Sequence, residues 1–100
     1  MVEYLTYKDK KYPFRVNYYA IKHYQLETGK ELDNVTTDIA STEILLWYAL
    51  IAGHDFEDKE LDLKRENMEF MLDVCLAEFN KLVLNFFPKT KELKEDNKKK

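Results

Sequence analysis

The amino-acid sequence predicts an α+β fold that is mostly helical, with an N-terminal β-hairpin followed by three main helices packed around an apolar central helix. Three observations predict this fold. Residues 44–52 are apolar or aromatic without a break, apolar residues recur at helical spacing from Met68 onward, and strand-like segments occur only within residues 1–16. We expect a single domain over residues 1–88 and a charged, disordered tail over residues 89–100.

Residues 44–52 (ILLWYALIA) favour a helix because Leu and Ala dominate, although Ile, Trp and Tyr leave a buried strand open. Ser41 is the expected N-cap, and Gly53 stands where a left-handed residue would end the helix. Apolar side chains surround the helix axis, so the helix must be covered on all sides, by the chain itself or by a partner. The run is shorter than the ~20 residues that span a membrane, and no membrane partner is expected.

The N-terminal region is predicted to form a hairpin. Val2–Tyr7 and Tyr12–Val16 have strand-like composition, and residues 8–11 form a polar turn between them. Pro13 cannot donate a backbone hydrogen bond, so it should lie on an edge strand.

A first helix is predicted over Tyr18–Thr28, with Asn17 as its N-cap and Gly29 at its end. Residues 30–40 are rich in turn formers and are expected to form a loop. That loop would be held to the core by one or more of its apolar residues, Leu32, Val35 or Ile39.

The last helix is expected to begin between Leu63 and Met68, with Asp62 and Asn67 as alternative N-caps, and to run to Phe87. Its core-facing stripe should consist of Met68, Met71, Leu72, Cys75, Phe79, Leu82, Val83 and Phe86. A weaker apolar stripe follows the opposite side, at Phe70, Val74 and Ala77.

The charge is unevenly distributed, although the net charge is only −3. Residues 31–88 hold four Lys or Arg against thirteen Asp or Glu, whereas both ends of the chain carry a net positive charge. An acidic middle repels phosphates, so no nucleic-acid partner is expected. The acidic connection at residues 54–62 is expected to be solvated, and its side chains Asp55, Glu57, Asp58 and Glu60 could dock a basic partner. A calcium loop is disfavoured because this run lacks the required glycine.

The sequence contains few residues for catalysis or metal binding. His23 and His54 are the only histidines, and Cys75, the only thiol, lies within the core-facing stripe of the last helix. We therefore expect no catalytic site, metal or cofactor, and a lone cysteine is consistent with a reducing, cytoplasmic environment. An RNA-binding face on the hairpin is an alternative, because basic and aromatic residues occur together there; tyrosines packed on a helix are the favoured interpretation.

Two amphipathic helices and a hairpin would struggle to cover all of the apolar surface. Surplus apolar surface on a small domain usually marks a protein interface or self-association into a homo-oligomer. The candidate interface residues are Tyr19, Leu26, Trp47, Phe70 and Val74, together with the four acidic side chains.

The order of these features resembles the tail assembly chaperones of long-tailed bacteriophages. The resemblance covers most of residues 5–87 and is carried by Lys-Tyr-Pro-Phe-Arg at 11–15, Ala-Ile at 20–21, Leu-Glu-Thr-Gly-Lys at 26–30, the apolar helix, the acidic connection and the last amphipathic helix. It implies a non-enzymatic protein of the host-cell cytoplasm, which shields the phage tape measure protein and helps to recruit tail tube subunits. The alternative is a small acidic inhibitor or adaptor that binds a host protein, for example in a basic groove.

Overall fold

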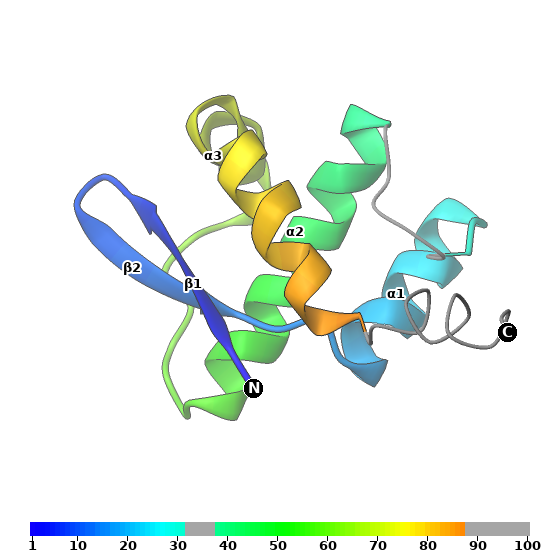
Figure 1. Cartoon of the computed structure of the whole chain (residues 1–100), viewed down its shortest axis with the longest axis horizontal. Helices are drawn as coiled ribbons and strands as arrows, with labels where there is room; N and C mark the ends of the chain where they lie inside the picture. Colours follow the sequence, from blue (N-terminus) through cyan, green and yellow to red (C-terminus); the bar gives the residue numbers. More distant parts are fainter. Residues whose placement is uncertain (32–37, 88–100) are drawn as a thin grey trace, which may run out of the picture.

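A computed structural model describes residues 1–31 and 38–87, and it confirms the predicted α+β class. An antiparallel hairpin lies at one end of the molecule and helix α1 at the other, with α2 and α3 between them (Figure 1). Helix α2 contacts α1, strand β2 and α3, so it is the centre of the fold, as predicted. The expected tail, and the candidate loop anchors Leu32 and Val35, lie outside the described residues.

The hairpin consists of β1 (Glu3–Tyr7) and β2 (Lys10–Phe14). The turn comprises Lys8 and Asp9 alone, shorter than the predicted four residues, and both have positive φ angles (51° and 66°). This geometry is that of a two-residue turn whose twist matches the strands. Both strands of a two-stranded sheet are edges, which accommodates Pro13 as predicted. One face of the sheet is buried against the helices, through Leu5, Tyr7, Tyr12 and Phe14.

Helix α1 spans Tyr18–Thr28, as predicted, because both of its ends carry local signals. The Asn17 side chain accepts a hydrogen bond from the Ala20 amide (3.0 Å). Gly29 has φ 73°, and its amide donates to the Gln25 carbonyl.

Helix α2 spans Ile39–Phe56 and is longer at both ends than predicted. The N-cap is Asp38, not Ser41: the Asp38 carboxylate accepts from the Ala40 amide (3.2 Å) and from the Ser41 hydroxyl (2.8 Å). Ile39 is therefore the first residue of the helix and is exposed, so its predicted role as a loop anchor was wrong.

Gly53 lies inside α2 and does not end it, contrary to the prediction. A Cβ at this position would lie 2.5 Å from both the Phe14 backbone nitrogen and the Pro13 carbonyl carbon. One turn earlier, the Ala49 carbonyl accepts a hydrogen bond from the Arg15 amide (3.1 Å). Glycine is needed here because the end of β2 crosses directly over the helix.

The third helix begins with a single 3-10 turn at Arg65–Asn67, continues as α3 (Met68–Val83) and ends in a second 3-10 turn at Leu84–Phe86. Asn67, one of the two predicted N-caps, directly precedes α3, but its side chain does not cap that helix: it reaches back and accepts from the amide of Lys64 (2.8 Å), the residue before the 3-10 turn. The predicted core stripe is confirmed, with only Leu82 and Phe86 half-buried. The α-helix stops four residues earlier than predicted, and the tighter last turn places Phe86 against Phe14, with ring centroids 5.6 Å apart.

Candidate functional site: an acidic-rimmed groove beside an exposed apolar helix face

The outer face of α3 exposes large apolar side chains. Phe70 and Val74 are 67% and 69% exposed, whereas Met71 and Cys75, next to them in sequence, are buried on the opposite side of the helix. Residues four apart in a helix lie on the same face, so Phe70 and Val74 form one patch. We call these two residues, with the exposed Ala77, the α3 patch.

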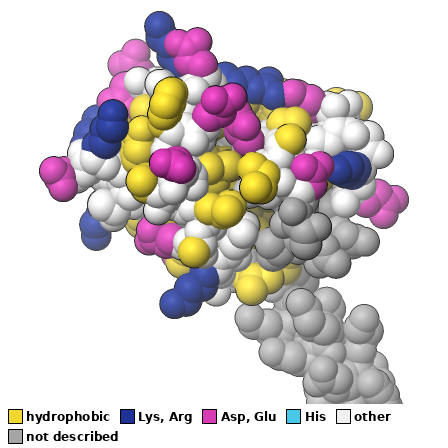
Figure 2. Space-filling model, turned by 90° about the horizontal axis from the view of Figure 1, so that it is seen from above, with side chains coloured by type: hydrophobic (Ala, Val, Ile, Leu, Met, Phe, Trp, Pro, Cys, Tyr) yellow, Lys and Arg dark blue, Asp and Glu magenta, His cyan; other side chains and the backbone are white. Residues whose placement is uncertain are grey.

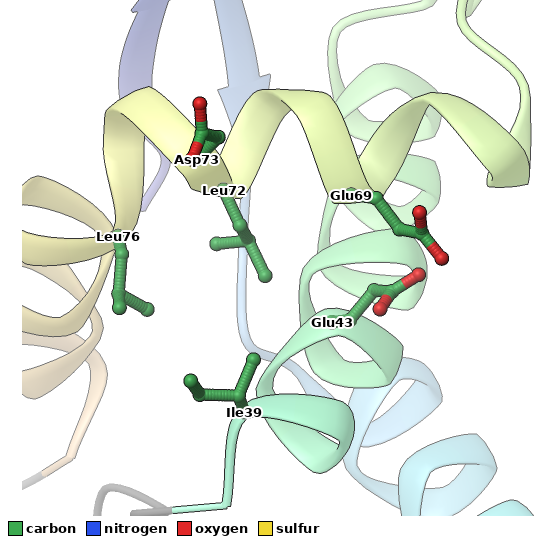
Figure 3. A pocket seen from close by; sticks show the side chains of 6 residues that line it. All are labelled: Ile39, Glu43, Glu69, Leu72, Asp73 and Leu76. Atoms are coloured by element: carbon green, nitrogen blue, oxygen red, sulfur yellow. The ribbon is translucent and has the colours of Figure 1, made fainter.

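A groove of about 390 Å³ lies between the start of α2 and the N-terminal half of α3. Leu72 and Leu76 point from α3 toward Ile39 on α2 and form its apolar floor (Figure 3). The other lining residues are all acidic: Glu43, Glu69 and Asp73. The Glu43 and Glu69 carboxylates point toward each other across one end of the groove, while that of Asp73 points away from the floor (Figure 3).

One face of the molecule combines apolar and acidic side chains. On the face seen in Figure 2, apolar side chains gather in the middle, with acidic side chains beside them and basic ones toward the edges. None of the three groove carboxylates forms an ion pair within the described part of the chain. By contrast, Glu27, Asp38 and Asp62 are each paired with a Lys or Arg elsewhere in the fold. A groove with an apolar floor and uncompensated negative charge can bind an apolar segment that carries positive charge.

The sequence did not predict this groove. The sequence pattern places Ile39 in a loop and Leu72 in the core stripe of the last helix. The four residues from α3, however, follow the spacing i, i+3, i+4 and i+7, which marks a single helix face: Glu69, Leu72, Asp73 and Leu76. The partner wall from α2 lies about 30 positions away in the sequence, and only the fold brings the two together.

The predicted interface residues of α1 and α2 lie elsewhere. Leu26 is 70% exposed on α1, whereas Trp47 is half-buried and packs against the core. Tyr19 is partly exposed and belongs to a ring cluster with His23 (centroids 4.4 Å apart) and Tyr48 (6.1 Å). None of these residues lines the groove, so the predicted interface residues do not form one surface.

Glu27 connects three parts of the fold at this ring cluster. Its carboxylate accepts from the Tyr48 hydroxyl (2.8 Å) and is ion-paired with the Arg65 guanidinium. Both donors stabilise the charged carboxylate, chiefly Arg65, so the pKa of Glu27 is lowered. The contact holds α1 against α2 and against the start of the third helix, and is structural in character.

The predicted acidic docking edge does not remain one group of exposed side chains, because Glu57 contacts the hairpin while Asp55, Asp58 and Glu60 face solvent. Glu57 accepts from the Tyr4 hydroxyl and lies 3.3 Å from Lys59, and its pKa is lowered, mainly by the Tyr4 hydrogen bond. Beyond this edge, Asp62 pairs with Lys10 (2.6 Å), which lowers the pKa of that carboxyl. These contacts tie the connection to the hairpin. The remaining acidic side chains are exposed: Asp55, Asp58 and Glu60.

A second hollow, of about 270 Å³, lies between α1 and the C-terminal part of α2. It brings together two of the predicted interface residues, Tyr19 and Asp55, beside Ile51, Ala52 and Asn17. This hollow shares Tyr19 with the ring cluster, and its lining residues are different from those of the groove between α2 and α3.

The residues considered for catalysis each contact a different partner in the fold. Cys75 is 2% exposed and its thiol donates to the Thr6 carbonyl (3.3 Å), and burial raises its pKa. His54 is buried and donates from Nδ1 to the Leu50 carbonyl (2.8 Å), whereas His23 belongs to the ring cluster. Within residues 1–31 and 38–87, no three His, Cys, Asp or Glu side chains are grouped as metal ligands would be.

Of the three hairpin tyrosines, Tyr7 and Tyr12 are buried in the core, whereas Tyr4 is exposed and donates its hydroxyl hydrogen bond to Glu57. Tyr7 and Tyr12 pack beneath Lys8 and Lys10, whose ammonium groups each lie 5.4 Å from a ring centroid. Buried rings cannot stack on the bases of single-stranded RNA. Of the helices described, none is long and apolar enough to cross a membrane.

Comparisons of the chain with protein-family models, with curated proteins and with solved structures give no match.

Proposed function

We propose that this chain is a non-enzymatic binding protein that acts as a bacteriophage tail assembly chaperone. Its task would be to shield the tape measure protein in the host cytoplasm and to help recruit tail tube subunits. The observation that carries the proposal is the exposed α3 patch beside the groove: Phe70 and Val74 face solvent while the core is filled from the opposite side of the same helix. Apolar surface of this kind on a small domain is typical of a site for another protein.

The sequence resemblance supports the phage assignment, and the fold agrees with the architecture on which it depends. The segments that carry it occupy β2, α1, α2, the acidic connection and α3, in the expected order. A long helical partner with apolar stretches would be covered through helix-in-groove contacts.

Co-expression tests the proposal. The tape measure protein encoded in the same genome is produced with and without this chain, and its soluble fraction is measured. We expect the chain to increase the soluble fraction, and we expect the Phe70→Glu/Val74→Glu variant to lose this effect while keeping its helical content. A soluble fraction that does not respond to the chain contradicts the proposal.

The second candidate function, binding of a basic surface on a host protein, is favoured by the exposed acidic side chains Asp55, Asp58 and Glu60. The two candidates depend on different surfaces. If the chain is a purely electrostatic inhibitor, neutralising these three residues would abolish its binding to the host protein. A chaperone that uses the α3 patch would keep most of its affinity for its partner. Genes for a tail tube protein and a long tape measure protein beside this gene would also favour the chaperone.

A further inference from the structure

We infer that the groove between α2 and α3 binds a cationic amphipathic helix of the partner protein, whose apolar side chains fill the groove while its Lys or Arg side chains contact Glu43, Glu69 and Asp73. The inference deepens the proposed function, on which it rests for the partner's identity. The chemistry of the bound segment follows from the groove itself.

The floor of the groove suits a helix. Leu72 and Leu76 are one helical turn apart, which is about 6 Å along α3. A helix docked alongside would present its own apolar side chains at the same spacing, as helix-in-groove partners do. Ile39, at the first turn of α2, forms the opposite side of the floor and is 65% exposed.

The charge of the lining selects the partner. Among the described residues, those that line the groove include three carboxylates and no Lys or Arg. Two of the carboxylates, Glu43 and Glu69, approach each other from different helices (Figure 3). Like charges held close together repel, and a cation between them would remove that repulsion. An acidic segment would increase it, so the same arrangement discriminates against acidic helices.

The groove is also placed to act together with the α3 patch. Asp73 lies on the helix surface between the groove floor at Leu72 and the patch residue Val74. A helix whose apolar stripe occupies the groove would therefore bring the rest of its length, or a second partner segment, within reach of the patch. A partner that covers both the groove and the patch would explain why the exposed apolar side chains Phe70 and Val74 lie beside the acidic side chains of the groove.

Fluorescence anisotropy with the full-length chain tests the inference. The probe is a designed helical peptide with Leu at positions i, i+4 and i+7 and Lys on both flanks. The matched peptide has Glu in place of every Lys. We expect the Lys peptide to bind with an affinity that falls as salt is added, and the Glu peptide to bind at least about tenfold more weakly at low salt.

Variants of the chain locate the site. We expect Glu43→Gln/Glu69→Gln/Asp73→Asn to weaken binding of the Lys peptide at least about tenfold at low salt. The matched control, Asp55→Asn/Asp58→Asn/Glu60→Gln, removes the same charge away from the groove and should change the affinity by less than about twofold. Ile39→Ser, at an exposed position, should weaken binding without unfolding the chain. Circular dichroism checks that each variant remains helical.

Four results would overturn the inference: equal affinity for both peptides, equal weakening by the two charge variants, no binding of the Lys peptide, or self-association of the chain that the groove variant abolishes. The last result would assign the groove to a second copy. The co-expression experiment is independent of these results. If the peptide fails to bind but the chain still keeps the tape measure protein soluble, only the groove assignment is wrong; in the opposite case the proposed function is wrong and the groove assignment stands.

Discussion

Gly53, in the last turn of α2, lies directly against the backbone of Phe14 at the end of β2, with no room for a Cβ between them. The hairpin can cross the helix this closely because glycine has no side chain. The contact is reinforced one turn earlier by the hydrogen bond from the Arg15 amide to the Ala49 carbonyl. The end of the hairpin is therefore fixed on the central helix.

The first prediction concerns this crossing. Gly53→Ala should destabilise the protein by roughly 1–3 kcal/mol, because backbone atoms must move to make room. Chemical denaturation measures the change. In an unobstructed helix interior the same substitution would stabilise by about 1 kcal/mol, so a stabilised Gly53→Ala variant would contradict the close approach.

The second prediction concerns the α3 patch. Phe70→Glu/Val74→Glu should change the free energy of unfolding by less than about 1 kcal/mol, because both side chains are exposed. The same variant should reduce binding of an apolar dye and any self-association seen by sedimentation. The control is Phe79→Ala at a fully buried position, which should cost about 3–5 kcal/mol. Unfolding of the patch variant would place these residues in the core and remove the basis of the proposed interface.

The third prediction concerns pH. Within residues 1–31 and 38–87, four carboxylates have lowered pKa values because a donor from another part of the chain stabilises their charged form: Glu27, Asp38, Glu57 and Asp62. The pKa of Asp38 falls from 3.8 to about 2, mainly through Lys30. A lowered pKa stabilises the fold above the unfolded value, and this contribution is lost as the pH falls through the folded value.

Thermal unfolding should therefore show a falling Tm as the pH drops from about 4.5 toward 2. All four groups lie near the surface, so added salt should reduce the effect. The Asp38→Asn variant should lose the part of the pH dependence of Tm that Asp38 contributes, which lies between pH 3.8 and about 2. A Tm that stays constant over this range would show that the pairs do not stabilise the fold.

The fourth prediction separates the acidic residues of the connection. Glu57→Gln and Asp62→Asn should lower the Tm, because each removes the charge that strengthens a contact to the hairpin, with Tyr4 and Lys10 respectively. Asp55→Asn/Asp58→Asn/Glu60→Gln should leave the Tm unchanged and, if this edge attracts a basic partner, should slow association and flatten its salt dependence. Stopped-flow measurement of the association rate at low salt checks the second part. An unchanged rate would leave the connection with a structural role alone.

Local signals predicted much of the fold. Asn17 and Gly29 bound α1 because capping depends on residues next to the helix end, and the last helix showed its core stripe because burial follows its period. The errors occurred where one residue type serves two purposes. Glycine commonly ends a helix, but Gly53 instead lets the backbone of Phe14 approach α2 closely. Asp38 and Ser41 are both suitable N-caps, and Asp38 is the one that caps α2. The role of Gly53 depends on its tertiary contact with Phe14, whereas Asp38 and Ser41 are both good N-cap residues and differ only in which helix start they define.

The candidate site was predicted only in part, for a similar reason. Phe70 and Val74 stood out because they interrupt a polar helix face at regular spacing. The groove depends on Ile39 and Glu43 lying opposite α3, and no local pattern contains that information. The pairing of Glu57 with Tyr4 likewise depends on how the hairpin packs.

The most direct test of the proposed binding surface is methyl and amide NMR of this chain titrated with a soluble helical fragment of the tape measure protein. We predict that the largest shift changes fall on Ile39, Leu72, Val74 and Leu76, and that Leu26 on α1 and the hairpin methyl group of Leu5 change little. Shift changes centred on Leu26, or none at saturating fragment, would contradict the assignment of the α3 patch and its groove as the binding site.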